Sequence, residues 1–128
     1  MRINSPHIAP GEPIGDLPAA GVLGGYLIGQ DIDGKSMVEY VLPNRFPGGP
    51  TVPFEASWWT VEPGRHTAQD EHEAQELWLI ASGAGQMRLG TEHFEVRAGQ
   101  AVYVPASQRH SVRAIGTEDL VVFSVWWK

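Results

Sequence analysis

Apolar residues along this chain occur in short runs, each bounded by glycine, proline or a pair of turn-forming residues. Runs rich in β-branched and aromatic residues predict strands at 22–28, 37–42, 55–62, 77–81, 86–89, 92–96, 101–104, 109–115 and 120–127. The pairs Asp33-Gly34 and Gly90-Thr91 favour hairpin turns. No segment keeps the apolar period of an amphipathic helix. Many short strands with tight turns predict an all-β domain, a sandwich or a closed barrel.

The first twenty residues differ from the rest because they are rich in proline. Their prolines are Pro6, Pro10, Pro13 and Pro18. Proline removes hydrogen-bond donors from a strand ladder, so we expect residues 1–20 to form an irregular arm. The arm could lie across the barrel, exchange with a partner subunit, or fray as an ordinary terminus. Residues 21–128 are expected to form one β-barrel domain.

The composition excludes some classes of partner and limits the residue types that could bind a metal. Nine Lys and Arg against fifteen Asp and Glu give a formal charge of −6, which argues against nucleic-acid binding and a polybasic membrane patch. The N-terminal sequence has no hydrophobic signal core, and no apolar run is long enough to span a bilayer, so we expect a cytoplasmic protein. The chain has no cysteine, which leaves His, Asp and Glu as its strong metal ligands.

A polar segment at 65–76 stands directly before the most apolar predicted strand. Residues of equal parity share one face of an extended chain, so Asp70, His72 and Glu76 can point the same way as Trp78 if the intervening bend keeps the phase. That face is predicted to line the barrel interior.

His110 belongs to another predicted strand, where Val112 and Ala114 share its parity and are apolar. His110 is therefore also expected to point inward. Inward charged groups are costly unless they are paired or bound to metal. Imidazole with carboxylate suits zinc, iron(II), manganese, nickel or copper, whereas a hydrogen-bonded core histidine is the simpler alternative.

Two long motifs in this region resemble those of the cupin superfamily. The first cupin motif is Gly, five residues, His-x-His, three or four residues, Glu, six residues, Gly. The corresponding residues here are Gly64, Asp70, His72, Glu76 and Gly83, with the spacing intact and Asp70 in place of the first His. The second motif is Gly, five residues, Pro-x-Gly, two residues, His, three residues, Asn. It corresponds to Gly99, Pro105, Ser107, His110 and Ala114, with Ser107 and Ala114 departing in type.

The resemblance covers about residues 55–127 and implies a single antiparallel barrel of the jelly-roll type. By the same resemblance, His72, Glu76 and His110 would bind one divalent metal, with zinc or iron expected first. Asp70 could be a ligand or could orient His72 or a bound water. Alternatively the metal could be weak or absent, with His72 and His110 acting as acid and base. His66 could swing in as a substitute ligand.

Other residues are candidates for contact with a substrate. Trp78 has the parity of the metal face and could line a pocket. Arg65 could hold a substrate carboxylate or phosphate, although most arginines on strands are solvated. Tyr103 and His66 are candidates for catalysis, with Tyr103 donating a hydrogen bond inside the cavity. A structural role near the rim is the simpler alternative for Tyr103.

The resemblance implies a metal-dependent enzyme acting on a small polar metabolite, with dioxygenase, isomerase, dehydratase or lyase chemistry, and specialised metabolism is one setting for such enzymes. The alternative is a non-catalytic module that binds a sugar or another small ligand. Cupin-like barrels are often dimers, so we expect a homodimer that binds a small molecule and contacts neither nucleic acid nor membrane. Fold alone does not choose among these activities.

Overall fold

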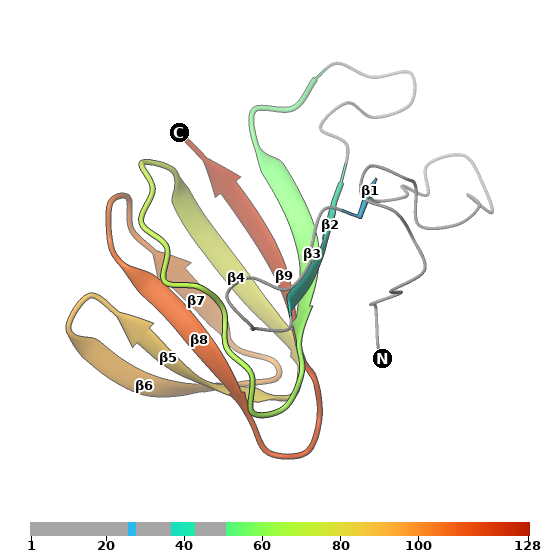
Figure 1. Ribbon diagram of the computed structural model, residues 1–128. Coiled ribbons are helices and arrows are strands. Elements are labelled where there is room, and N and C mark those ends of the chain that lie inside the picture. The colour runs from blue at the N-terminus through green and yellow to red at the C-terminus, as the bar shows by residue number, and fades with distance from the viewer. Residues whose placement is uncertain (1–25, 28–36, 43–50) are drawn as a thin grey trace.

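Figure 1 shows the computed structural model of the chain, which describes residues 26–27, 37–42 and 51–128. The described strands are β1 (Tyr26–Leu27), β2 (Met37–Val41), β3 (Glu55–Val61), β4 (Gln75–Ser82), β5 (Ala84–Leu89), β6 (Glu92–Arg97), β7 (Ala101–Val104), β8 (His110–Ile115) and β9 (Leu120–Trp127). The expected arm at 1–20, the predicted turn at Asp33-Gly34 and most of the predicted strand 22–28 lie outside the described residues.

All strand pairings are antiparallel, and they form two sheets. One sheet has the order β1-β2-β3-β9-β4-β7, and the other has the order β6-β5-β8. The two sheets face each other in Figure 1. The described residues contain no helix, which confirms the all-β, jelly-roll prediction. Among the described strands the two sheets are separate ladders, so of the two expected arrangements the hydrogen bonding is that of a sandwich, which is consistent with the jelly-roll type.

The core lies between the sheets, and alternation along each strand builds it. On β4, Trp78 and Ile80 are each 3% exposed while Leu79 is 43% exposed. On β8, Val112 and Ala114 are buried in the same way. The continuous buried cluster comprises Trp59, Val61, Trp78, Ile80, Met87, Val96, Val102, Val104, Val112, Ala114, Leu120 and Val122. The inward faces predicted for β4 and β8 are therefore confirmed.

One turn and one strand boundary can be compared with the sequence prediction. The hairpin predicted at Gly90-Thr91 joins β5 to β6, and Gly90 has a φ of 59°, a value that glycine adopts without strain. Strand β4 begins at Gln75, two residues before the predicted start, so Glu76 pairs with Val104 and Trp126 on the neighbouring strands.

The described residues include no helix long and apolar enough to cross a membrane.

Candidate metal centre

The loop before β4 is held against the edge of β8 by main-chain hydrogen bonds. The amide of Thr67 donates to the carbonyl of Val112 at 2.9 Å. Asp70 and His110 form an isolated antiparallel bridge, in which each amide donates to the other residue's carbonyl at 2.9 Å. These bonds bring the polar segment at 65–72 beside the start of β8, at one end of the sandwich.

Main-chain carbonyls fix the two histidine rings. Nδ1 of His72 lies 2.8 Å from the carbonyl of Ala74, and Nδ1 of His110 lies 2.9 Å from the carbonyl of Gln108. A carbonyl oxygen can only accept a hydrogen bond, so each Nδ1 carries the hydrogen and donates. In the neutral imidazole, Nε2 then presents a lone pair.

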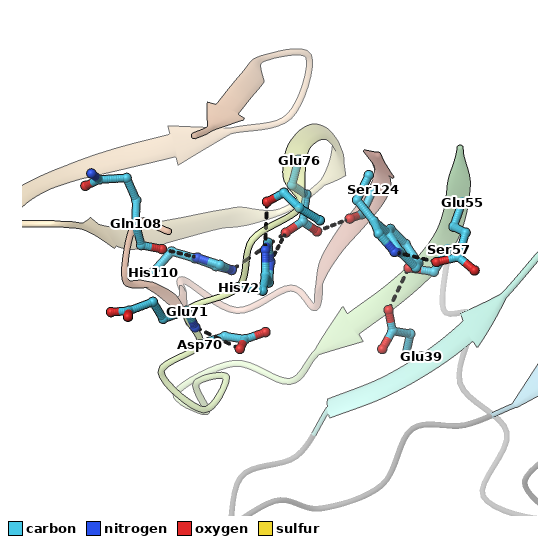
Figure 2. A network of polar contacts seen from close by, with 12 residues as sticks. Glu39, Glu55, Ser57, Asp70, Glu71, His72, Glu76, Gln108, His110 and Ser124 are labelled. Carbon is cyan, nitrogen blue, oxygen red and sulfur yellow. Dashed lines mark hydrogen bonds and ion pairs between the residues drawn. The ribbon is translucent and has the colours of Figure 1, made fainter. Parts of the chain in front are cut away.

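Both Nε2 atoms face one oxygen of Glu76, as Figure 2 shows. Oε1 of Glu76 lies 3.1 Å from Nε2 of His72 and 3.6 Å from Nε2 of His110. The second oxygen of Glu76 accepts a hydrogen bond from the hydroxyl of Ser124, which is buried on β9. Two imidazole lone pairs and a carboxylate oxygen therefore converge, which is unfavourable unless a proton or a cation lies among them.

The chemistry and spacing of these atoms fit a divalent metal. Ligands that lie about 2.0–2.2 Å from a zinc or iron ion are separated from one another by roughly 3.0–3.5 Å. The distances from Glu76 Oε1 to the two Nε2 atoms are close to that range. Such a cation would accept the three lone pairs and offset the carboxylate charge.

Asp70 offers a further acceptor to the two histidines. One carboxylate oxygen of Asp70 and one nitrogen each of His72 and His110 all lie within 4.8 Å of one another. Asp70 is exposed, and its Oδ1 accepts a hydrogen bond from the amide of Glu71 at 2.8 Å. The two histidines thus lie beside both carboxylates that the sequence named as candidate ligands. They form one group with Asp70, whose ligand atoms lie within 4.8 Å of one another, and they approach Glu76 through the separate Nε2–Oε1 distances of 3.1 and 3.6 Å.

Three other residues that the sequence suggested as site residues do not contribute to this centre. His66 is exposed, its Nδ1 lies 3.0 Å from the carbonyl of Thr67, and it is absent from the group of converging ligand atoms. Arg65 is also exposed and borders neither cavity at the centre. Tyr103 is half exposed on the outer face of the larger sheet, where its hydroxyl donates to Gln75, because Val102 and Val104 take the inward positions of β7. The expectation that Tyr103 acts inside the cavity is therefore wrong.

Two spaces that share the lining residues Glu39, Asp70 and Glu76 adjoin the centre. An inner cavity of about 370 Å³ is bordered by Asp70, Glu76, His110, Trp59 and Trp78 among others. Its aromatic floor forms because Trp78 packs edge-on against Trp59 at 4.8 Å and against His110 at 5.9 Å between ring centroids. The buried Nε1 of Trp78 has no hydrogen-bond partner among the described residues. Trp78 thus occupies the pocket position for which the sequence nominated it.

The outer space has a volume of about 730 Å³ and reaches the last residues of the chain. Trp126 and Trp127 both border it and are both half-buried. Nε1 of Trp126 donates to a carboxylate oxygen of Glu55 at 2.8 Å. Together the two spaces are large enough for a small metabolite.

Glu39 was missed by sequence reasoning. It lies on β2, borders both cavities, and accepts a hydrogen bond from the buried hydroxyl of Ser57 at 2.6 Å. Burial raises the pKa of its carboxyl group, the Ser57 hydrogen bond opposes that shift, and the charges of Glu76 and Asp70 add to it. The available signal was a lone carboxylate between the apolar neighbours Val38 and Tyr40 in a predicted strand.

The part of the chain that carries the two motifs matches the profile of a known protein family. The cupin domain profile aligns with residues 57–126, which run from within β3 to within β9 and include Asp70, His72, Glu76 and His110. The chain belongs to the cupin family. An uncharacterised protein of Methanocaldococcus jannaschii is similar to this cupin, with 32% identity over 91 residues, 70% of each chain.

Solved structures agree with the assignment. A cupin 2 conserved barrel domain protein from Salinispora arenicola is 28% identical, with a TM-score of 0.59 over 76% of this chain and 78% of that one. A cupin 2 conserved barrel domain protein from Rhodopseudomonas palustris has a TM-score of 0.67 over 87% of this chain and 77% of that one. At 21% identity, the second likeness shows the fold alone.

At one position of the second motif, this cupin keeps the backbone geometry although the residue type differs. Ser107 stands where the second motif has its glycine, and it has a φ of 62°, in the left-handed region that glycine favours. The Ser107 amide donates to the carbonyl of His72 at 2.7 Å. This bond ties the turn before β8 to the loop that carries His72, so the substituted turn still positions the centre.

Proposed function

We propose that this cupin is a metal-dependent enzyme that acts on a small polar metabolite. The convergence of the two Nε2 atoms on Oε1 of Glu76 carries the proposal, because both rings have their other nitrogen committed to a carbonyl. His72, His110 and Glu76 would hold the cation, and Asp70 would complete or tune the set. Ligands of this type suit zinc or iron first, then manganese, nickel or copper.

The bound cation would supply Lewis acidity toward a substrate oxygen, or activate water or oxygen. The protein's own residues provide the rest of the site. Ser124 holds the carboxylate of Glu76 in place, and the carbonyls of Ala74 and Gln108 hold the two rings. Trp78 and Trp59 close the floor of the inner cavity against the aliphatic core and exclude water from that side.

Metal analysis tests the proposal directly. We expect wild-type protein, purified without added metal and then titrated with zinc or iron(II), to bind one of them stoichiometrically. His110→Ala should lose that binding. His93→Ala is the matched control, because His93 is an exposed histidine on β6, outside the converging group. A wild type that takes up no metal, or a His110→Ala variant that binds like wild type, would overturn the proposal.

The metal that is found directs the search for the reaction. Iron with oxygen uptake would favour a dioxygenase, whereas zinc without redox activity would favour an isomerase, dehydratase or lyase. Stable binding of a small ligand without conversion would instead favour a sensing module. The homodimer expected from the sequence stays a prediction, and sedimentation of the full chain beside a chain lacking residues 1–20 tests it.

A further inference from the structure

Two serine–carboxylate pairs stand side by side across the larger sheet. Ser57 and Ser124 are register partners on β3 and β9. Ser57 holds Glu39 on β2, and Ser124 holds Glu76 on β4, an arrangement visible in Figure 2. Glu76 faces the two histidines, but Glu39 has no cationic partner among the described residues.

Glu39 is placed to meet a ligand rather than the metal. It pairs in register with Trp59, so its side chain lies on the inner face of the sheet, and it borders both the inner and the outer cavity. Only Oε2 accepts the Ser57 hydroxyl, which leaves Oε1 with its acceptor capacity. A partly buried carboxylate with a single neutral donor is a costly group unless a further donor reaches it.

The walls around Glu39 are acidic. The inner cavity is bordered by Glu39, Asp70 and Glu76, and its described lining contains no lysine or arginine. The outer cavity adds Glu55 and Glu73, with Lys128 as the cationic residue among its described lining residues. A bound cation would offset the charges of Asp70 and Glu76, which lie beside the two histidines, but Glu39 does not face that group. A ligand carboxylate or phosphate placed beside Glu39 would therefore meet repulsion.

The floor offers a complementary donor. Trp78 borders the inner cavity, is 3% exposed, and its Nε1 has no hydrogen-bond partner among the described residues. Buried indole N–H groups are normally satisfied, so an acceptor oxygen on a ligand would remove this deficit. The cavity thus combines an open acceptor on Glu39 with an open donor on Trp78.

We propose that Glu39 is a specificity-determining residue that accepts a hydrogen bond from a hydroxyl or ammonium group of the ligand. The ligands selected are uncharged or cationic molecules that also carry an acceptor oxygen for Trp78, such as polyols and amino alcohols. This inference rests on the proposed function, because the same cavity must hold the cation and the ligand.

The test compares ligand preference in zinc-loaded wild type, Glu39→Gln and Glu95→Gln. Glu95 is an exposed glutamate on β6 and serves as the matched control. The probes are 1-amino-2-propanol, 1,2-propanediol and lactate, which share a hydroxyl and differ in charge. Affinities are measured by NMR titration at mildly alkaline pH, with the Trp78 indole N–H signal assigned through Trp78→Phe.

We expect Glu95→Gln to keep the wild-type order of affinities, and the amino alcohol and the diol to shift the Trp78 indole signal in both proteins. Glu39→Gln should reduce the preference for the amino alcohol over lactate by about tenfold, the loss expected for one charge-assisted hydrogen bond. The diol distinguishes the two kinds of donor. Glu39→Gln should reduce the affinity for the diol, which offers a hydroxyl, less than it reduces the affinity for the amino alcohol, which offers an ammonium. Glu39→Gln should still bind zinc stoichiometrically.

Failure of the role of Glu39 and failure of the proposed function give different results. If wild type binds neither zinc nor iron(II), the proposed function fails. If zinc binds but the preference is the same in Glu39→Gln and wild type, the role of Glu39 is overturned while the metal centre stands. If zinc-loaded wild type binds none of the probes, the role of Glu39 is likewise overturned.

Discussion

Asp70 and His110 pair through their main chains, each donating its amide hydrogen to the other's carbonyl at 2.9 Å. This bridge joins the two cupin motifs at the point where their side chains converge. It also explains why an aspartate can replace the first motif histidine without displacing the loop, because the bridge uses no side-chain atom. The Asp70 carboxylate is then free to turn toward His72 and His110.

Two substitutions at Asp70 should differ in their effect on metal affinity. Asp70→Asn removes a charge that lies near the two histidines, and we expect it to weaken zinc binding by about 10–100-fold, whether Asp70 ligates directly or orients a ligand. Asp70→His restores the usual motif residue and should bind zinc at least as tightly as wild type. Competition titration with a chelator of known affinity measures both.

Glu71→Gln is the control for Asp70, since Glu71 is the adjacent carboxylate and pairs with Arg109 on the surface. It should bind zinc like wild type. Equal affinities in wild type, Asp70→Asn and Asp70→His would show that Asp70 does not contribute to the centre.

Ser124 should support the centre without touching the metal. Its buried hydroxyl donates to Glu76, so Ser124→Ala leaves that carboxylate without its positioning donor. We expect metal affinity to fall by about 10–100-fold, the usual effect of losing such a partner. Ser111→Ala, a half-buried serine on β8, is the control and should leave metal affinity unchanged. A wild-type affinity in Ser124→Ala would contradict the role of this hydrogen bond.

Glu39 should make stability depend on pH. Its pKa is raised from the ordinary value of 4.5, chiefly by burial, so the folded chain binds the proton more tightly than the unfolded chain does. Stability from this group is fully present below the unfolded pKa and is lost as the pH rises through the folded pKa. Glutamine is uncharged at every pH and can still accept from Ser57. Glu39→Gln should therefore stabilise the metal-free protein at neutral pH.

The measurement is thermal unfolding of metal-free wild type and Glu39→Gln across a pH series. The gain in melting temperature should be largest at neutral pH and should shrink as the pH falls toward 4.5. Glu95→Gln, which removes an exposed charge, should show no such trend. A gain that grows toward acidic pH would contradict the assignment.

Much of the fold could be predicted because its signals are local. Alternation on β4 predicted Trp78 and Ile80 inside, and the resemblance of the two motifs to those of cupins implied that His72 and His110 converge. Tyr103 could have been placed correctly by the same alternation, since Val102 and Val104 flank it. The open arrangement of the two sheets depends on which strand edges pair, and no local pattern specifies that.

Glu39 and its serine were harder to find for a different reason. The role of Glu39 depends on β2 pairing with β3, and the role of Ser57 depends on its register with Ser124 on β9. Those relationships join segments far apart in the chain. A single sequence contains no record of register between distant strands, so the carboxylate appeared only as an isolated polar residue in an apolar strand.

The two glycines that bound the first motif should differ in their tolerance of a side chain. Gly64 and Gly83 both have a left-handed backbone, with φ values of 81° and 78°. A Cβ on Gly64 would meet nothing within 4 Å, so Gly64→Ala should lose only the conformational cost of about 1–2 kcal/mol. A Cβ on Gly83 would collide with the carbonyl oxygen of Asp119 and lie 3.0 Å from its carbonyl carbon.

Gly83→Ala should therefore destabilise the fold by roughly 3–5 kcal/mol, because strain and a backbone clash act together. The clash cannot relax through a side-chain rotation, since the opposing atoms are main chain at the start of β9. Denaturant unfolding of both variants beside wild type gives the comparison. Equal losses of stability in Gly64→Ala and Gly83→Ala would show that the segment before β9 moves aside, and that Gly83 is required for its dihedral angle alone.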